Sequence, residues 1–203
     1  MTSIQKLTIN IRNLLKKNNL KTIEKLKPLI YSQQIDWKNY KHLINLHQEK
    51  LETRHVIKYY KDYEIKKVEG DSNYYYKMTL PYTDESDIFG LHLIKWMPFS
   101  RSLIHNHEDM GCLFKVMEGK LEESIFDDNY FDLMEVKSYQ SQQSSQERND
   151  IAYIDNNIGL HSIQNIIKFP TYSLHLYANS HQNKDIKTYS HRNFSLIKYF
   201  PFS

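Results

Sequence analysis

The chain has 203 residues, which suits one domain with a core of ordinary size, and we expect residues 1–203 to form it. Its formal net charge of +3 comes from scattered basic residues, which argues against a nucleic-acid partner, and no apolar run approaches the ~20 residues of a membrane span. The single cysteine, Cys112, cannot form a disulfide framework, so we expect a cytoplasmic protein, and we also expect a monomer.

The first 57 residues are predicted to be helical. Apolar residues recur with the three- and four-residue spacing of one helix face within 4–15, again within 23–30, and less regularly over 43–56. The first 23 residues carry five basic side chains and no acidic one, which would also fit a mitochondrial presequence. The apolar stripe favours the alternative, a basic amphipathic helix that packs on a core.

From about residue 58 the pattern changes to short runs rich in Tyr, Ile, Leu and Phe. Turn-forming residues interrupt these runs every eight to twelve residues, which predicts an all-β sandwich or barrel over 58–203. We also expect a long loop over the polar stretch 138–148. The turn-forming clusters lie at 69–73, 83–87, 127–129 and 155–157.

His105 and His107 are the first residues with metal-binding chemistry. Side chains two positions apart on a strand point to the same side of the sheet, so one short segment would present two imidazoles together. With ten histidines in the chain, a His-x-His pair alone is weak, and two incidental histidines would also explain it. His92, within the apolar run 91–94, is interpreted as a strand histidine with satisfied hydrogen bonds.

The residues that surround the pair favour a metal site. Cys112 and Gly119 follow it, and a second segment holds Gly159, His161 and Asn165. This spacing resembles the two cupin motifs, His-x-His…Glu…Gly and Gly…His…Asn. The resemblance predicts a mainly β cupin barrel with N-terminal α-helices, in which His161 would arrive from a distant strand.

Cys112 stands where most metal cupins have a glutamate ligand, so three neutral imidazoles would remain. Imidazole suits iron, copper, zinc and nickel, and ligand type alone does not choose the metal. Three ligands leave positions open for a substrate and O2, whereas a structural zinc site would be closed by a fourth protein ligand. No fourth ligand is apparent unless Cys112 itself binds.

A row of polar residues lies near the C-terminus, where Ser173, His175 and Tyr177 alternate with two leucines. Strand alternation places the three polar side chains on one face. A buried polar row costs free energy unless each group has a partner, and a purely structural network is one explanation of it. On the inner face of a metal barrel, three such residues favour a hydrogen-bonded relay beside the metal.

These segments together closely resemble the cysteine dioxygenase family, over about residues 74–180. The resemblance implies a non-haem iron oxidoreductase that converts L-cysteine and O2 to cysteine sulfinic acid. Its partners would be a small thiol and O2, and each chain would hold one Fe(2+) through His105, His107 and His161. The matching stretches are 105–107, Cys112, 119–123, 152–154, 158–161 and 173–177.

The resemblance also implies catalytic roles for four residues beside the metal. Cys112 would be joined by a thioether bond to Tyr177. Ser173 and His175 would support that tyrosine through hydrogen bonds. A ring fixed in this way would be held ready to contact the substrate or O2.

Tyr75 and Lys77 match a tyrosine and a cation that bind the substrate in this family. The family has an arginine at the cation position, and lysine cannot offer a planar two-donor fork. A dioxygenase of another small thiol, such as 3-mercaptopropionate, cysteamine or an N-terminal cysteine, is therefore one alternative. A non-catalytic metal-binding cupin is another alternative, although it would need no pairing of Cys112 and Tyr177. A sugar-phosphate or storage cupin with zinc or no metal is a third, although it would not explain the loss of the motif glutamate.

Overall fold

The computed structural model describes residues 3–15, 37–52, 64–80, 89–107, 111–128, 132–141, 151–178 and 188–190. These residues contain two helices, α1 (Ser3–Leu15) and α3 (Trp37–Glu52), and the strands that follow them. None of the described helices is long and apolar enough to cross a membrane. The strands are β1 (Glu64–Glu69), β2 (Tyr74–Thr79), β3 (Phe89–Trp96), β4 (Ile104–His105), β5 (Cys112–Glu118), β6 (Lys120–Phe126), β7 (Leu133–Gln140), β8 (Ile151–Ile154), β9 (Leu160–Asn165), β10 (Thr171–Ala178) and β11 (Thr188–Tyr189).

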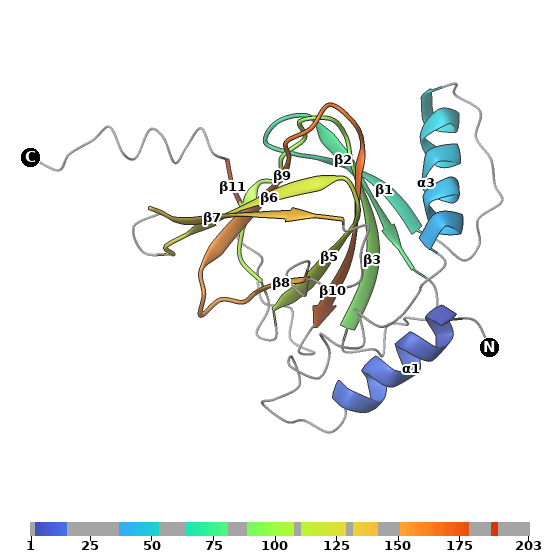
Figure 1. Cartoon of the computed structure of the whole chain (residues 1–203), viewed down its shortest axis with the longest axis horizontal. Coiled ribbons are helices and arrows are strands. Elements are labelled where there is room, and N and C mark those ends of the chain that lie inside the picture. The colour runs from blue at the N-terminus through green and yellow to red at the C-terminus, as the bar shows by residue number, and fades with distance from the viewer. Residues whose placement is uncertain are drawn as a thin grey trace, which may run out of the picture.

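The strands form two antiparallel sheets, which confirms the mainly β fold predicted from the sequence. One sheet has the order β1-β2-β3-β10-β5-β8 and the other has the order β11-β4-β9-β6-β7. In Figure 1 the sheets curve around a shared interior, with α3 beside β1 and β3 and α1 below the strand ends. Neighbours far apart in sequence, such as β3 and β10, are therefore adjacent in space.

Strands β3 and β10 at the centre of the larger sheet are buried on both faces. Leu91, Leu93, Leu174 and Leu176 point outward and pack beneath the helices. The helices contribute buried apolar side chains of their own to this cluster, namely Leu7, Ile11 and Ile44. The opposite face of the same two strands points into the barrel and carries the polar row.

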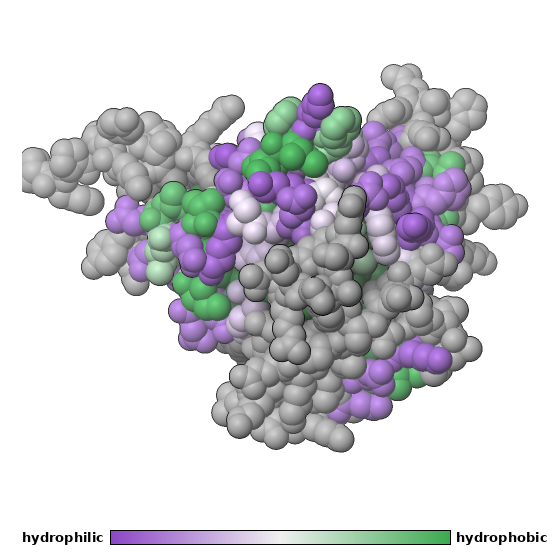
Figure 2. Space-filling view, viewed as in Figure 1, coloured by the Kyte–Doolittle hydropathy of each residue, from purple (hydrophilic) through white to green (hydrophobic). Residues whose placement is uncertain are grey.

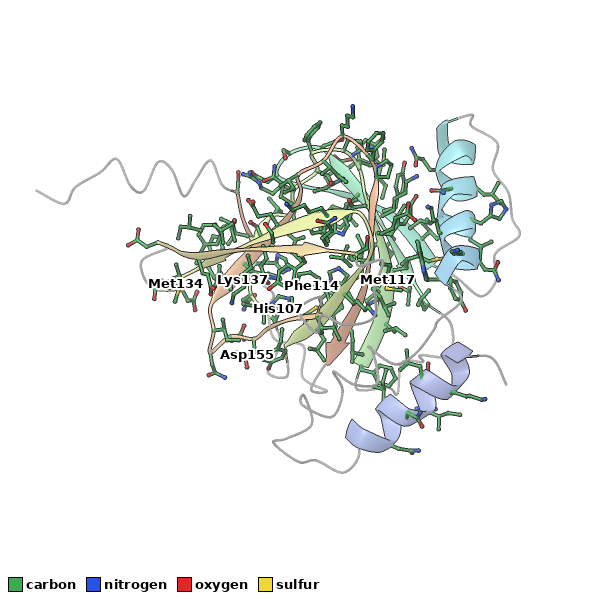
Figure 3. The ribbon with its side chains drawn as sticks, viewed as in Figure 1. His107, Phe114, Met117, Met134, Lys137 and Asp155 are labelled. Carbon is green, nitrogen blue, oxygen red and sulfur yellow. The ribbon has the colours of Figure 1, made fainter. Side chains whose placement is uncertain are left out.

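Apolar side chains fill one end of the barrel interior. Trp96, Phe114 and Val116 pack there with Leu121 and Ile163 from the other sheet. Figure 3 places Phe114 and His107 between the two sheets, whereas Met134 lies at the outer end of β7. The interior is therefore packed at one end, and the polar residues gather at the other.

The surface in Figure 2 is largely hydrophilic, with hydrophobic side chains exposed at a few places. Among the described residues, β7 exposes three of them, since Leu133, Met134 and Val136 are 49%, 59% and 48% accessible. This strand lies at the edge of its sheet. The polar row and the predicted metal ligands lie inside the barrel and not on this surface.

Two sequence predictions need correction. Strand β7 runs to Gln140 and pairs with β6, so residues 138–140 belong to a strand and not to the predicted loop. They look like a loop in sequence because an edge strand with one exposed face needs few apolar residues, and only Tyr139 is buried there. Helix α3 also begins earlier than predicted, at Trp37, because aromatic side chains extend its apolar stripe.

Other predictions agree with the structure or lie outside it. The helix predicted over 4–15 and the turns between β1 and β2, after β6, and between β8 and β9 are present. The helix predicted over 23–30 and the turn at 83–87 lie outside the described residues, as do 53–56 and 142–148.

Candidate metal centre

Three histidines from different parts of the barrel meet at one point. The ligand nitrogens of His105, His107 and His161 all lie within 4.8 Å of one another. His105 ends β4 and pairs directly with His161 on β9. The set that the sequence indicated is thus brought together from positions more than fifty residues apart.

His107 is placed differently from the sequence expectation. Strand β4 ends at His105, so His107 follows it in a loop and does not continue the strand. Its backbone N–H donates to Asn156 Oδ1 at 2.9 Å, which replaces a sheet partner. Asn156 was read from sequence only as a turn residue, and nothing local indicated this contact.

Hydrogen bonds fix which nitrogen of two of these rings is available. His105 Nδ1 donates to the carbonyl oxygen of Leu103 at 2.9 Å, because a carbonyl can only accept. His161 Nδ1 likewise donates to Glu123 Oε1 at 2.6 Å, because an ionised carboxylate can only accept. Each neutral ring then presents the lone pair of its Nε2 to the centre, and these two atoms are 3.3 Å apart. Facing lone pairs repel, so the arrangement suits a cation between them.

His107 gives a second indication that this position suits a metal ion. It is 4% exposed, and neither ring nitrogen has a hydrogen-bond partner among the described residues. An unpartnered buried polar group costs ~1–3 kcal/mol, which a bound metal ion would relieve. Burial lowers the pKa of His105, His107 and His161, so the rings are neutral at pH 7, the form that binds metals.

Glu123 on β6 is a residue to which sequence reasoning gave no role. It is 1% exposed and accepts hydrogen bonds from His161 Nδ1 and from the Tyr139 hydroxyl, the latter at 2.9 Å. Burial raises the pKa of Glu123 to about 7, and a cation at the centre would favour the ionised form. One feature of the sequence could have indicated this role. Glu123 alternates with Leu121 and Ile125 on the inward face of a strand, where an acidic residue is unexpected.

Cys112 and Tyr177 are direct neighbours across β5 and β10. A hydrogen bond joins the thiol and the phenol, and the Tyr177 ring stacks on His107 with 6.0 Å between centroids. Burial raises the pKa of both groups, so both are protonated at pH 7. The structure therefore places the pair beside the three histidines, as the sequence indicated.

The polar row of β10 takes part in a chain of hydrogen bonds. The chain begins at Trp96, to which the sequence analysis gave no role. Trp96 Nε1 donates to Ser173 Oγ at 2.8 Å, and Ser173 Oγ lies 2.7 Å from His175 Nε2. Ser173 Oγ accepts from the indole, and among the described residues His175 Nε2 is the acceptor within reach of its own hydrogen. With Nε2 accepting, the neutral His175 ring carries its hydrogen on Nδ1, which faces the Cys112 sulfur at 3.8 Å. The chain thus ends on Cys112, while His175 stacks on Tyr177 at 5.9 Å.

A cavity of about 330 Å³ opens beside these groups. Tyr75, Lys77 and Tyr177 line it together with His105 and His107. The Lys77 ammonium lies 4.8 Å from the centre of the Tyr177 ring. Both residues expected to bind a substrate therefore lie at the same cavity as the histidine cluster.

His92 also lines this cavity, and its interpretation as a satisfied strand histidine is wrong. Its Nδ1 is buried without a hydrogen-bond partner in the described part of the chain, and its ring meets Tyr177 edge-on at 5.4 Å. Burial, and then the charge of Lys77, lower the pKa of His92 to about 3. Of the apolar neighbours that suggested a core position, Leu91 and Leu93 lie on the other face of β3, whereas Ile94 lines the cavity with His92.

Comparisons with known proteins agree with this site. A family model described as cysteine dioxygenase type I matches residues 46–192. Cysteine dioxygenase type 1 of Danio rerio is 34% identical over 110 residues, which cover 53% of this chain and 54% of that protein. The Rattus norvegicus protein of the same name is 34% identical over 91 residues, or 44% of each chain. The chain thus spans about half the length of the curated relatives it matches.

Solved cupin structures show weaker likeness. A cupin-2 domain protein from Rhodospirillum rubrum aligns with a TM-score of 0.47 and 11% identity, over 68% of this chain and 80% of that one. The cupin domain of an XRE family transcriptional regulator from Enterobacter cloacae aligns with a TM-score of 0.40 and 20% identity, over 52% and 97%.

Proposed function

The chain belongs to the cysteine dioxygenase type I family, whose model matches residues 46–192, and from this premise we propose that it is an iron(II)-dependent thiol dioxygenase that acts on L-cysteine. The observation that carries the proposal is the cluster of three histidines, which no carboxylate of the described residues joins, beside the Cys112 and Tyr177 pair at a cavity. The reaction adds one O2 to one thiol and gives one sulfinic acid, so its atoms balance without another reactant.

We propose that His105, His107 and His161 hold one Fe(2+) per chain. Three imidazoles leave positions open for substrate and O2, which a closed structural zinc site would not. Bound iron would stabilise the substrate as thiolate and allow it to react with O2, which zinc cannot do because it has no redox chemistry. The chain's own contribution is to keep each Nε2 free, through the bonds that His105 and His161 make at Nδ1.

Tyr177 is proposed to orient the reacting groups. Tyr177 lines the cavity beside His105 and His107, and its hydroxyl would donate a hydrogen bond to the substrate or to O2. Ser173 and His175 hold the Cys112 side of the pair through their hydrogen bonds. A thioether between Cys112 and Tyr177 would replace an S–H and a ring C–H bond, with O2 accepting the two hydrogens, and would fix the ring.

Tyr75 and Lys77 are proposed to bind the substrate. The Lys77 ammonium would meet the substrate carboxylate in a charge-assisted hydrogen bond, worth ~1.5–3 kcal/mol. Tyr75, a partly buried residue that lines the same cavity, remains protonated because burial raises its pKa to about 12, and its hydroxyl can donate as well. A second candidate substrate, 3-mercaptopropionate, has the same carboxylate and lacks only the amine.

The proposal is tested by aerobic incubation of the iron-loaded protein with L-cysteine, 3-mercaptopropionate and cysteamine. O2 uptake and sulfinate formation are followed together, and zinc-loaded protein is the control. We expect L-cysteine to give the highest kcat/KM, and Lys77→Ala to lower it ~10- to 150-fold while cysteamine changes little. No sulfinate from any thiol would contradict the proposed function.

A further inference from the structure

Gly90 and His92 form a matched pair on the inner face of β3. A Cβ placed on Gly90 would lie 2.8 Å from His92 Nε2, closer than such contacts occur. Only glycine therefore leaves room for the imidazole where it lies. Gly90 pairs with Tyr177, so the His92 ring leans toward that level of the barrel, in agreement with its edge-on contact with Tyr177.

The two nitrogens of His92 lie in different surroundings. Nδ1 is buried and has no hydrogen-bond partner among the described residues. Nε2 does not share this state and lies at the far end of the ring, beside Gly90, in a residue that lines the cavity. The ring is neutral, so it carries one hydrogen. A hydrogen on Nδ1 would have no acceptor, which places it on Nε2, where it can be donated into the cavity.

Lys77 lies close to this donor. Its Nζ lies 4.8 Å from the centre of the Tyr177 ring, and the centre of the His92 ring lies 5.4 Å from the same point. The charge of Lys77 lowers the pKa of His92, and both residues line the cavity. A carboxylate has two oxygens, and an ammonium is a point charge that does not present a two-donor fork. A directional N–H beside the ammonium would supply the second donor that a carboxylate needs when it leaves water.

We propose that His92 donates a hydrogen bond from Nε2 to the carboxylate of the substrate and shares with Lys77 the selection of small thiols that carry an acid group. This inference rests on the proposed function, since it assigns the anionic end of the same substrate. His92 is thus a specificity-determining residue, and Gly90 is the residue that positions it.

The test compares two thiols that differ in the carboxylate. Wild type, His92→Leu and His92→Gln are loaded with iron, and kcat/KM is measured for L-cysteine and cysteamine. We expect His92→Leu to lower kcat/KM for L-cysteine ~10-fold or more, mainly through KM, and to change cysteamine less than ~2-fold. His92→Gln keeps an N–H donor and should restore most of the loss. His42→Leu, at an exposed helix position, is the matched control.

Binding provides a readout that does not need turnover. Anaerobic calorimetry of the iron-loaded variants with L-cysteine and cysteamine should show the same selective loss in Kd. An inactive wild type would overturn the proposed function, while these Kd values would still decide the role of His92. Equal losses for the two thiols, or none for either, would overturn the inference.

Gly90→Ala tests the geometry without removing the imidazole. The added methyl group must displace the His92 ring, because the contact would be 2.8 Å. We expect the same selective loss for L-cysteine as in His92→Leu, in a protein that keeps its iron. A Gly90→Ala variant that still discriminates the two thiols like wild type would contradict the proposed position of the donor.

Discussion

The two faces of β3 and β10 are both buried and have opposite chemistry. On the outer face, leucines pack against α1 and α3, and each side chain is satisfied by contact alone. On the inner face, a chain of hydrogen bonds from Trp96 to Cys112 leaves few polar groups without a partner. Among the described residues, His92 Nδ1 on this face and both ring nitrogens of His107 in the loop after β4 are buried without a hydrogen-bond partner, and both residues line the cavity. Ser100 Oγ is also unpartnered but does not line the cavity. The two histidines therefore mark the part of the polar interior that suits a ligand.

The comparison predicts that substitutions on the two faces affect different properties, and the largest effect is expected at the histidines. His161→Ala should weaken iron binding by more than ~100-fold, since even hydrogen-bond partners of metal ligands contribute ~10- to 100-fold. Iron per chain is measured after equilibration at limiting metal, with His42→Ala as the control. Full iron occupancy in His161→Ala would mean that the three histidines are not the metal site.

An outer-face substitution should have the reverse effect. Leu176 is 1% exposed beneath the helices, so Leu176→Ala should lower the free energy of unfolding by ~2–5 kcal/mol. Iron affinity of the folded protein should stay unchanged, because the removed atoms face away from the barrel. Denaturant unfolding and iron titration measure the two properties. A loss of iron affinity without a loss of stability would contradict the separation of the faces.

Glu123 should have an intermediate effect on the inner side. Glu123→Gln keeps the shape and one acceptor but removes the negative charge beside His161, so iron affinity should fall ~10- to 100-fold. Tyr139→Phe leaves the bond between Glu123 and His161 in place and is the matched control, with a smaller expected loss. Competition with a chelator measures both affinities. Equal affinities in wild type and Glu123→Gln would show that the carboxylate charge has no part in holding the metal.

The smallest effect is expected from Cys112. During turnover a fraction of the protein should become two hydrogens lighter in intact mass, and Cys112→Ala should lack this species. The variant should retain partial activity, because the bond would position Tyr177 without supplying electrons or protons. A turned-over sample with unchanged mass and a freely alkylated Cys112 would show that no thioether forms.

Sequence patterns predicted the site residues that lie close together in the chain. The row at 173–177 follows strand alternation. The change from three- and four-residue spacing to short apolar runs interrupted by turn residues separated helices from strands. The sequence did not assign three residues to the site, because their roles depend on contacts with segments distant in the chain. These residues are Glu123, Asn156 and His92. Alternation also could not show that His107 lies beyond the end of β4, since that depends on the Asn156 side chain.

The proposed activity is tested most directly by the origin of the oxygen atoms in the product. Iron-loaded protein is given L-cysteine under oxygen-18 gas, and the product is analysed by mass spectrometry, with His161→Ala as the control. We predict cysteine sulfinic acid in which both added oxygens carry the label, formed with consumption of one O2 per cysteine. Cystine as the product, or sulfinate that takes an oxygen from water, would contradict a dioxygenase centred on the three histidines.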